Sequence, residues 1–135
     1  DTKTIDRVID TKVPFDCFTF PYFVTEVDPD YYVQLQVYMD LTGLRKASVC
    51  FCLENGSDNQ VERLSWQKAK EKDKDEPDID EWDEAEKELS YNHLPEHLRI
   101  KVFEFEYDEE LIEKLKSRVI EARKYIENEL VSKLK

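Results

Sequence analysis

The chain has 135 residues, and 39% of them are charged. This length suits one domain with a single core and leaves little room for a second. Lys and Arg total 20 against 32 Asp and Glu, which gives a formal net charge of −12. Because affinity for DNA comes largely from Lys and Arg meeting phosphates, this balance argues against a protein that coats nucleic acid.

The three cysteines form no disulfide framework. Cys50 and Cys52 share one face of a predicted strand and Cys17 stands alone, which indicates a reducing compartment. The sequence has neither a signal-peptide pattern nor an apolar run of about 18 residues. We therefore expect a soluble, cytoplasmic protein that does not enter a membrane.

The first predicted element is a strand at residues 7–13, where Val8, Ile9 and Val13 are β-branched. Side chains alternate along a strand, so Asp10 and Lys12 point to the same face, roughly 6 to 7 Å apart at their Cα atoms. An edge strand with a hydrated polar face is one interpretation. The other is that the two charges pair or bind a third group, such as a divalent metal with a phosphate.

Residues 15–28 form an aromatic, irregular segment in which the prolines exclude a long helix. We expect a loop or short turns whose aromatic rings pack into the core. The alternative is that exposed rings stack on the bases of single-stranded ends. The aromatic residues are Phe15, Phe18, Phe20, Tyr22 and Phe23.

A helix is predicted over residues 30–42, with Asp28 or Asp30 as its N-cap, Pro29 just inside and Gly43 as its terminator. The apolar stripe that we expect to face the sheet consists of Val33, Val37, Leu41 and Leu44. Gln34 and Tyr38, four apart, lie beside that stripe. Gln36 points about 200° round the helix and is expected to be structural.

Residues 47–53 are apolar on both faces and predict an interior strand. After residue 54 the chain becomes polar, with a short helix supported by Val61, Leu64, Trp66 and Ala69. An acidic insertion follows at about residues 70–92, with ten carboxylates between residues 73 and 88. We expect it to be solvated, with a helix over residues 80–92 that Trp82, Ala85 and Leu89 anchor.

A half-hydrated strand is predicted at residues 100–107, followed by a long final helix that Asp108 caps. Apolar residues recur along this helix at spacings of three and four, which predicts that it covers the sheet or forms an oligomer surface. They are Leu111, Leu115, Val119, Ala122, Ile126, Leu130 and Leu134.

Three segments together resemble the PD-(D/E)XK nuclease superfamily. They are Ile9-Asp10-Thr11-Lys12, the helical run from Tyr31 to Met39 with its Gln-x-Gln pattern, and Leu41-Thr42-Gly43. The nearest likeness is to the YqaJ-like and phage lambda exonuclease-type DNA exonucleases, with the RecB-type nucleases as relatives. The resemblance implies an α/β fold with a restriction-endonuclease-like mixed β-sheet flanked by helices, including the long C-terminal helix.

The resemblance also implies a set of site residues. Asp10 and the Thr11 backbone carbonyl would hold Mg²⁺ or Mn²⁺, which take oxygen ligands. Lys12 and Gln34 would act on the attacking water and the scissile phosphate. Tyr31 and Tyr38 would contact the DNA strand.

In the family, a strand ahead of the Asp-x-Lys strand carries a further metal-binding Asp, within a Pro-Asp pair. Asp6 is a poor substitute, since it lies roughly 13 Å from Asp10 along one strand. Asp1 could face Asp10 only if the chain formed a tight hairpin at Ile5 and Asp6, and Ile is a poor turn residue. The chain thus resembles the C-terminal part of such a nuclease, one N-terminally incomplete domain over residues 1–135, or else it lacks one metal ligand.

The function implied is a metal-dependent DNA exonuclease in phage-type recombination or DNA end processing. Its expected partners are linear duplex DNA or single-stranded ends, a further copy of the chain, or a single-strand annealing protein. The 135-residue chain alone is expected to be weak or inactive. One alternative is a non-catalytic nuclease-fold subunit that binds a partner, and another is an acidic interaction module unrelated to nucleases.

Overall fold

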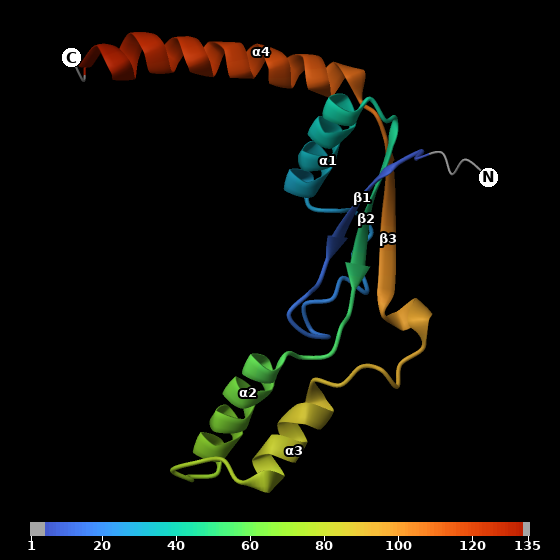
Figure 1. The fold of residues 1–135 in the computed structure, drawn as a ribbon, viewed down its shortest axis with the longest axis vertical. Helices are drawn as coiled ribbons and strands as arrows, with labels where there is room; N and C mark the ends of the chain where they lie inside the picture. The colour runs from blue at the N-terminus through green and yellow to red at the C-terminus, as the bar shows by residue number, and fades with distance from the viewer. Residues whose placement is uncertain (1–4, 134–135) are drawn as a thin grey trace. The chain divides into compact units, whose positions relative to one another are not determined.

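The computed structural model describes residues 5–133 and has a mixed α/β fold (Figure 1). The expectation for Asp1 therefore lies outside the described residues. The strands are β1 (Val8–Lys12), β2 (Lys46–Cys52) and β3 (Ile100–Glu106). The helices are α1 (Pro29–Thr42), α2 (Asp58–Glu71), α3 (Ile79–Glu88) and α4 (Glu109–Tyr125). Each of the strands and helices predicted from the sequence is present, with boundaries shifted by a few residues.

The strands form one sheet in the order β1-β2-β3. At one end Leu53 donates to the carbonyl of Arg99, and at the other Tyr107 donates to the carbonyl of Arg45. Residue numbers thus run in opposite directions along β2 and β3, which makes this pair antiparallel. Figure 1 shows β1 and β2 pointing the same way, with α1 as the crossover between them. The sheet is therefore mixed, as predicted.

Contacts divide the chain into two compact units, and each strand contributes to both. The first unit holds residues up to 10, 27–48 and from 104 onwards. The second holds residues 11–26 and 49–103. The expectation of one domain remains a prediction, and each unit is described by itself below.

Helix α1 begins and ends where the sequence indicates. The Asp28 side chain accepts a hydrogen bond from the Asp30 amide at 2.8 Å and so caps the first turn. Gly43 ends the helix at φ 73°, in the left-handed region that glycine adopts without steric cost. In the first unit, α1 packs on the sheet face that carries Phe105, whose ring centroid lies 5.4 Å from that of Tyr32.

The prediction of which α1 residues face the sheet was wrong. Leu35, Gln36 and Met39 are fully buried, whereas Val37 is 37% exposed and Leu41 is 77% exposed. At about 100° per residue, the buried residues lie roughly 150° round the helix from the predicted stripe. A polar residue lies in the buried stripe because its amide is satisfied by backbone partners, which the hydrophobic pattern does not reveal.

Helix α4 lies against α1 only over its first turns, where Ile112 is buried. Beyond Leu115 the apolar stripe does not cover the sheet, because Val119, Ile126 and Leu130 are 50%, 48% and 47% exposed. The alternative that this part forms an oligomer surface stays a prediction. After Tyr125 the helix continues as a π-helical turn (Ile126–Leu130) and a 3-10 turn (Val131–Lys133). Leu134, the last residue of the predicted stripe, lies outside the described residues.

The core of the second unit is a cluster of Phe20, Leu53 and Tyr91, with Tyr22 and Phe51 packed against it. Core packing of the aromatic segment is thus confirmed for Phe20 and, in part, for Tyr22. It is wrong for three other rings: Phe15, Phe18 and Phe23 are 54%, 84% and 97% exposed.

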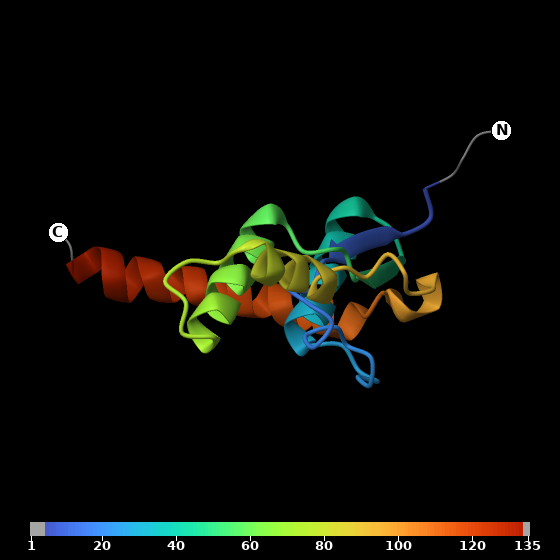
Figure 2. The same cartoon turned by 90° about the horizontal axis from the view of Figure 1, so that it is seen from below.

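Helices α2 and α3 form a hairpin and lie side by side in both views (Figure 1 and Figure 2). Ala69 and Ala85 are fully buried between them, and Leu89 is 7% exposed. Helix α3 ends at Glu88 rather than at residue 92 as predicted, and Trp82 is 39% exposed rather than anchored in the core. None of the described helices is long and apolar enough to cross a membrane.

Candidate functional site

Strand β1 presents Asp10 and Lys12 on the same side, as its alternation requires. Both side chains are half-buried, whereas Ile9, Thr11 and Val13 between and beside them are exposed. One carboxylate oxygen of Asp10, Oδ2, is fully shielded from solvent. Neither charged group lacks an interaction partner, which agrees with the expectation that buried charges are compensated.

The Asp10 side of β1 is the face of the sheet that α1 covers. Arg7, just before β1, donates to the Ser48 hydroxyl at 3.2 Å and also to the Glu104 carboxylate. Its side chain therefore lies over the face on which Ser48 and Glu104 stand. Because side chains alternate along the strand, Asp10 points to the opposite face, where α1 packs.

On α1, Gln34 and Tyr38 form a direct pair. The Gln34 amide Nε2 donates to the Tyr38 hydroxyl at 2.7 Å. Gln34 is half-buried, beside the buried stripe of the helix, and Tyr38 is 39% exposed. Tyr31, one turn earlier, is half-buried. Three of the predicted site residues thus share one helix on the covered face of the sheet.

Gln36 has the structural role that the sequence indicates. Its side chain is fully buried, its Nε2 donates to the Glu106 carbonyl at 2.8 Å, and its Oε1 accepts from the Asp108 amide at 2.7 Å. The amide thereby fixes α1 to the turn between β3 and α4. A nearby hydroxyl, that of Tyr32, donates to the Asp108 carboxylate at 3.2 Å, and burial, followed by the Asp108 charge, raises the pKa of Tyr32.

Few cations stand near these motifs, and most are already engaged. Arg7 pairs with Glu104, whose hydrogen bond and charge raise the pKa of the guanidinium, on the face away from Asp10. The Arg45 guanidinium lies 4.1 Å from the ring centroid of Tyr107. Lys46 is exposed at the start of β2. Lys12 is consequently the cation best placed to act beside Asp10.

The two cysteines of β2 make a poor metal site. Their Sγ atoms lie 3.6 Å apart, and both thiols are free. Burial, and next the hydrogen bond with Cys50, raise the pKa of Cys52 to about 11. Because metals bind the thiolate, a thiol that stays protonated at neutral pH is a weak ligand.

The Asp10 side of β1 offers part of a ligand set for a divalent cation. Asp10 offers a carboxylate oxygen and Thr11 a backbone carbonyl, and both are ligands that hard cations prefer. Among residues 5–133, no group of three or more His, Cys, Asp or Glu side chains is gathered in a metal-binding arrangement. Mg²⁺ commonly retains several waters and uses one or two carboxylates plus substrate phosphate, so this partial set remains compatible with it.

One solved structure shares this fold over nearly the whole chain. It is the crystal structure of a phage-related exonuclease from Haemophilus somnus 129PT, with a TM-score of 0.68 and 26% sequence identity. The match covers 96% of this chain and 52% of that chain, so this chain spans about half the length of that exonuclease. No protein-family model matches the sequence, and no curated protein matches it.

The likeness confirms the predicted nuclease-like fold: a mixed sheet flanked by helices with a long C-terminal helix. Membership of the PD-(D/E)XK superfamily, the metal and the roles of Asp10, Lys12 and Gln34 remain predictions.

Sequence reasoning offered the aromatic segment as a base-stacking surface but missed the α2 residues that lie against it. The exposed rings of Phe15 and Phe18 border a hollow against α2, and Gln60 of α2 donates to the Phe15 carbonyl at 2.9 Å. The spacing of Asp16 and Thr19 signals a side-chain-stabilised turn that would expose the ring between them. The partner helix, in contrast, has no local signal in the sequence.

Proposed function

We propose that this chain carries the catalytic residues of a metal-dependent DNA exonuclease. The supporting observation is that Asp10, with one carboxylate oxygen shielded from solvent, and Lys12 lie on the same half-buried face of β1, in a fold that matches a phage-related exonuclease. The substrate proposed is linear DNA, and the setting is phage-type recombination or end processing.

Each residue has a defined task in this proposal. Asp10 and the Thr11 carbonyl hold Mg²⁺ or Mn²⁺, which when bound supplies charge stabilisation and lowers the pKa of water. Lys12 orients the attacking water, accepts or relays its proton and stabilises the charge that develops on the phosphate. Gln34, held by Tyr38, positions that water through its amide. Tyr31 and Tyr38 contact the DNA strand.

Full activity requires more than the residues described. A single carboxylate and a carbonyl leave most of an octahedral ion to water and substrate, so a further carboxylate from outside residues 5–133 would raise metal affinity. We therefore expect the 135-residue chain to be weak or inactive by itself and the full natural protein to be active. A homo-oligomer and a single-strand annealing protein remain proposed partners, and the exposed stripe of α4 supplies a surface for association.

The test uses the full natural protein, end-labelled linear duplex DNA and Mg²⁺. We expect mononucleotides released from an end, no cutting of covalently closed circles, and no activity in EDTA. Lys12→Ala should lower turnover at least about 100-fold, because a positioned proton-transfer group contributes that much, while metal binding is retained. Lys46→Ala, at an exposed position on β2, is the matched control and should cleave normally.

Undiminished cleavage by Lys12→Ala would contradict the mechanism. The acidic balance of the chain, −12, favours a second candidate, a non-catalytic subunit of the same fold that binds a partner protein. A full natural protein that degrades neither DNA nor RNA would favour that candidate.

A further inference from the structure

The second unit contains a hollow that none of the proposed catalytic residues line. Its volume is about 340 Å³, within the range of small-molecule sites. Its walls come from the aromatic segment on one side and from α2 on the other. The residues used below include Phe15, Phe18, Gln60 and Arg63.

Two aromatic rings in this wall are exposed, Phe15 at 54% and Phe18 at 84%. Exposed rings that border a hollow mark a binding surface more often than an isolated exposed apolar residue does. Both rings stand on a rigid turn. The Asp16 carboxylate accepts from the amides of Phe18 and Thr19 at 3.0 and 2.8 Å, and the Thr19 hydroxyl accepts from the Asp16 amide at 3.1 Å.

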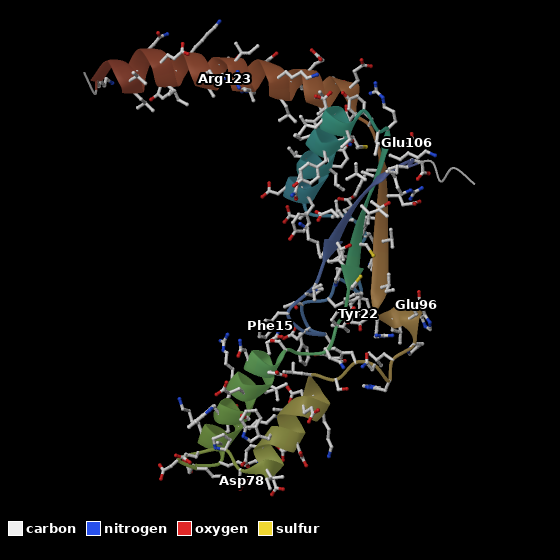
Figure 3. The ribbon with its side chains drawn as sticks, in the orientation of Figure 1. Phe15, Tyr22, Asp78, Glu96, Glu106 and Arg123 are labelled. Carbon is white, nitrogen blue, oxygen red and sulfur yellow. The ribbon has the colours of Figure 1, made fainter. Side chains whose placement is uncertain are left out.

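The turn is also fixed to the rest of its unit. The Gln60 side-chain amide donates a hydrogen bond to the Phe15 carbonyl at 2.9 Å, and the backbone amide of Cys17 donates to the Tyr91 hydroxyl at 3.2 Å. Figure 3 shows Phe15 beside the first turn of α2. A side chain presented on a fixed turn loses little conformational entropy when it binds a ligand, so the rings are preorganised.

The opposite wall supplies a cation. Among the described residues, no carboxylate lies within ion-pair distance of the Arg63 guanidinium. Two carboxylates also line the hollow. Glu88 pairs with Lys68 at 2.7 Å, and Asp16 accepts hydrogen bonds from the amides of its own turn, so each has a compensating partner. In a chain with a net charge of −12, an uncommitted guanidinium next to two exposed rings is a specific arrangement.

We propose that this hollow binds an unpaired nucleobase of single-stranded DNA, with the adjoining phosphate on Arg63. Aromatic rings stack on any base, and arginine meets phosphate through its planar fork. The proposal rests on the DNA-processing function above and adds to it a contact for the separated strand.

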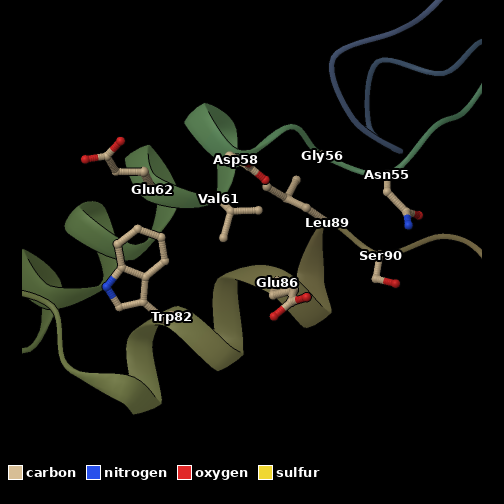
Figure 4. A pocket seen from close by; sticks show the side chains of 9 residues that line it. All are labelled: Asn55, Gly56, Asp58, Val61, Glu62, Trp82, Glu86, Leu89 and Ser90. Carbon is tan, nitrogen blue, oxygen red and sulfur yellow. The ribbon is translucent and has the colours of Figure 1, made fainter.

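A second hollow in the same unit differs in its charge. It measures about 390 Å³ and is bordered by the 39%-exposed Trp82, but its polar residues include Asp58, Glu62 and Glu86 (Figure 4). These carboxylates would repel a phosphate. We therefore expect no binding of single-stranded DNA in this second hollow, and Trp82 serves as an aromatic control residue in an acidic setting.

The experiment measures the affinity of the 135-residue chain for a fluorescein-labelled 15-mer of dT by anisotropy, in EDTA so that no cleavage occurs. Phe15→Ala and Phe18→Ala should each weaken binding roughly 5- to 100-fold, the range for loss of one stacked base. Arg63→Gln should weaken binding and lower its salt dependence. Phe23→Ala, which removes a 97%-exposed ring outside the hollow, and Trp82→Ala should bind like the parent chain.

A second probe separates stacking from charge. With an abasic 15-mer of the same backbone, the effect of Phe15→Ala should disappear and that of Arg63→Gln should persist. Phe15→Ala that binds dT like Phe23→Ala would overturn the inference and leave an apolar peptide as the better occupant. Failure of the parent chain to bind the 15-mer would overturn it as well. Neither result bears on the metal-dependent cleavage of duplex ends, which is tested separately.

Discussion

Buried polar residues carry much of the specificity of this fold. Glu81 has no exposed surface, yet its carboxylate accepts from Lys74 at 2.7 Å, from Lys72 at 3.0 Å and from the Asp78 amide at 3.0 Å. Figure 3 marks Asp78 at the start of α3. This one carboxylate therefore links the first turn of α3 to the segment that connects α2 and α3. The hydrogen bond from Lys74, then that from Lys72, hold the pKa of Glu81 well below its ordinary value of 4.5.

Acid stability should report this arrangement. A carboxyl whose pKa is depressed by folding stabilises the native state above its unfolded pKa, and that stabilisation is lost as pH falls through the folded value. Glu81→Gln should therefore lower the urea midpoint at pH 7 and lose less further stability below pH 4.5 than the parent chain. Glu84→Gln, which removes a half-exposed partner of Lys72, is the control and should keep the parent's pH dependence.

An acid dependence of Glu81→Gln equal to that of the parent would contradict this role. The sequence does not distinguish Glu81 from nine other carboxylates in the same run, because its burial arises from the hairpin. The Asp10 and Lys12 pair, in contrast, was predictable. Strand alternation is a local rule, and it alone places both side chains on one face.

At the scale of elements, local signals set the boundaries and long-range packing sets the orientation. Asp28, Gly43 and Asp108 cap or end helices as predicted, since capping depends on neighbours in sequence. The rotation of α1 was not predictable, because Gln36 is buried by partners about 70 residues away. The end of the α4 stripe was missed because amphipathicity reveals an apolar face and not what covers it.

The two glycines give a matched test of the element junctions. At Gly56, between β2 and α2, an added Cβ would lie 2.7 Å from Leu89 Cβ, so Gly56→Ala should cost about 1–3 kcal/mol by overpacking. At Gly43 an added Cβ meets nothing within 4 Å, and the cost of Gly43→Ala is the left-handed conformation, about 1–2 kcal/mol.

Chemical denaturation measures both changes. Gly43→Asn should recover part of the loss at the α1 terminus, because Asn tolerates the left-handed region. Gly56→Asn should recover nothing, because its defect is steric. Equal recovery at the two sites would mean that the Gly56–Leu89 contact does not limit this junction.

For the whole molecule, the acidic charge and the proposed DNA substrate need to be reconciled. Lys68, Lys72 and Lys74 pair with carboxylates within the α2–α3 hairpin, so part of the charge is compensated locally. The nuclease-like fold was inferred from three short motifs and is confirmed by a solved exonuclease structure, about half of which this chain matches.

Divalent-metal binding at Asp10 is the property on which the proposed activity depends. Calorimetric titration of the 135-residue chain with Mn²⁺ measures it directly. The buffer contains 150 mM KCl, at which the Debye length is about 8 Å. We expect a dissociation constant at or below the millimolar range. Asp10→Asn should abolish the heat of binding, and Asp6→Asn, at an exposed carboxylate just before β1, should leave it unchanged. An unchanged heat with Asp10→Asn would contradict the proposed site and place the ion on other carboxylates.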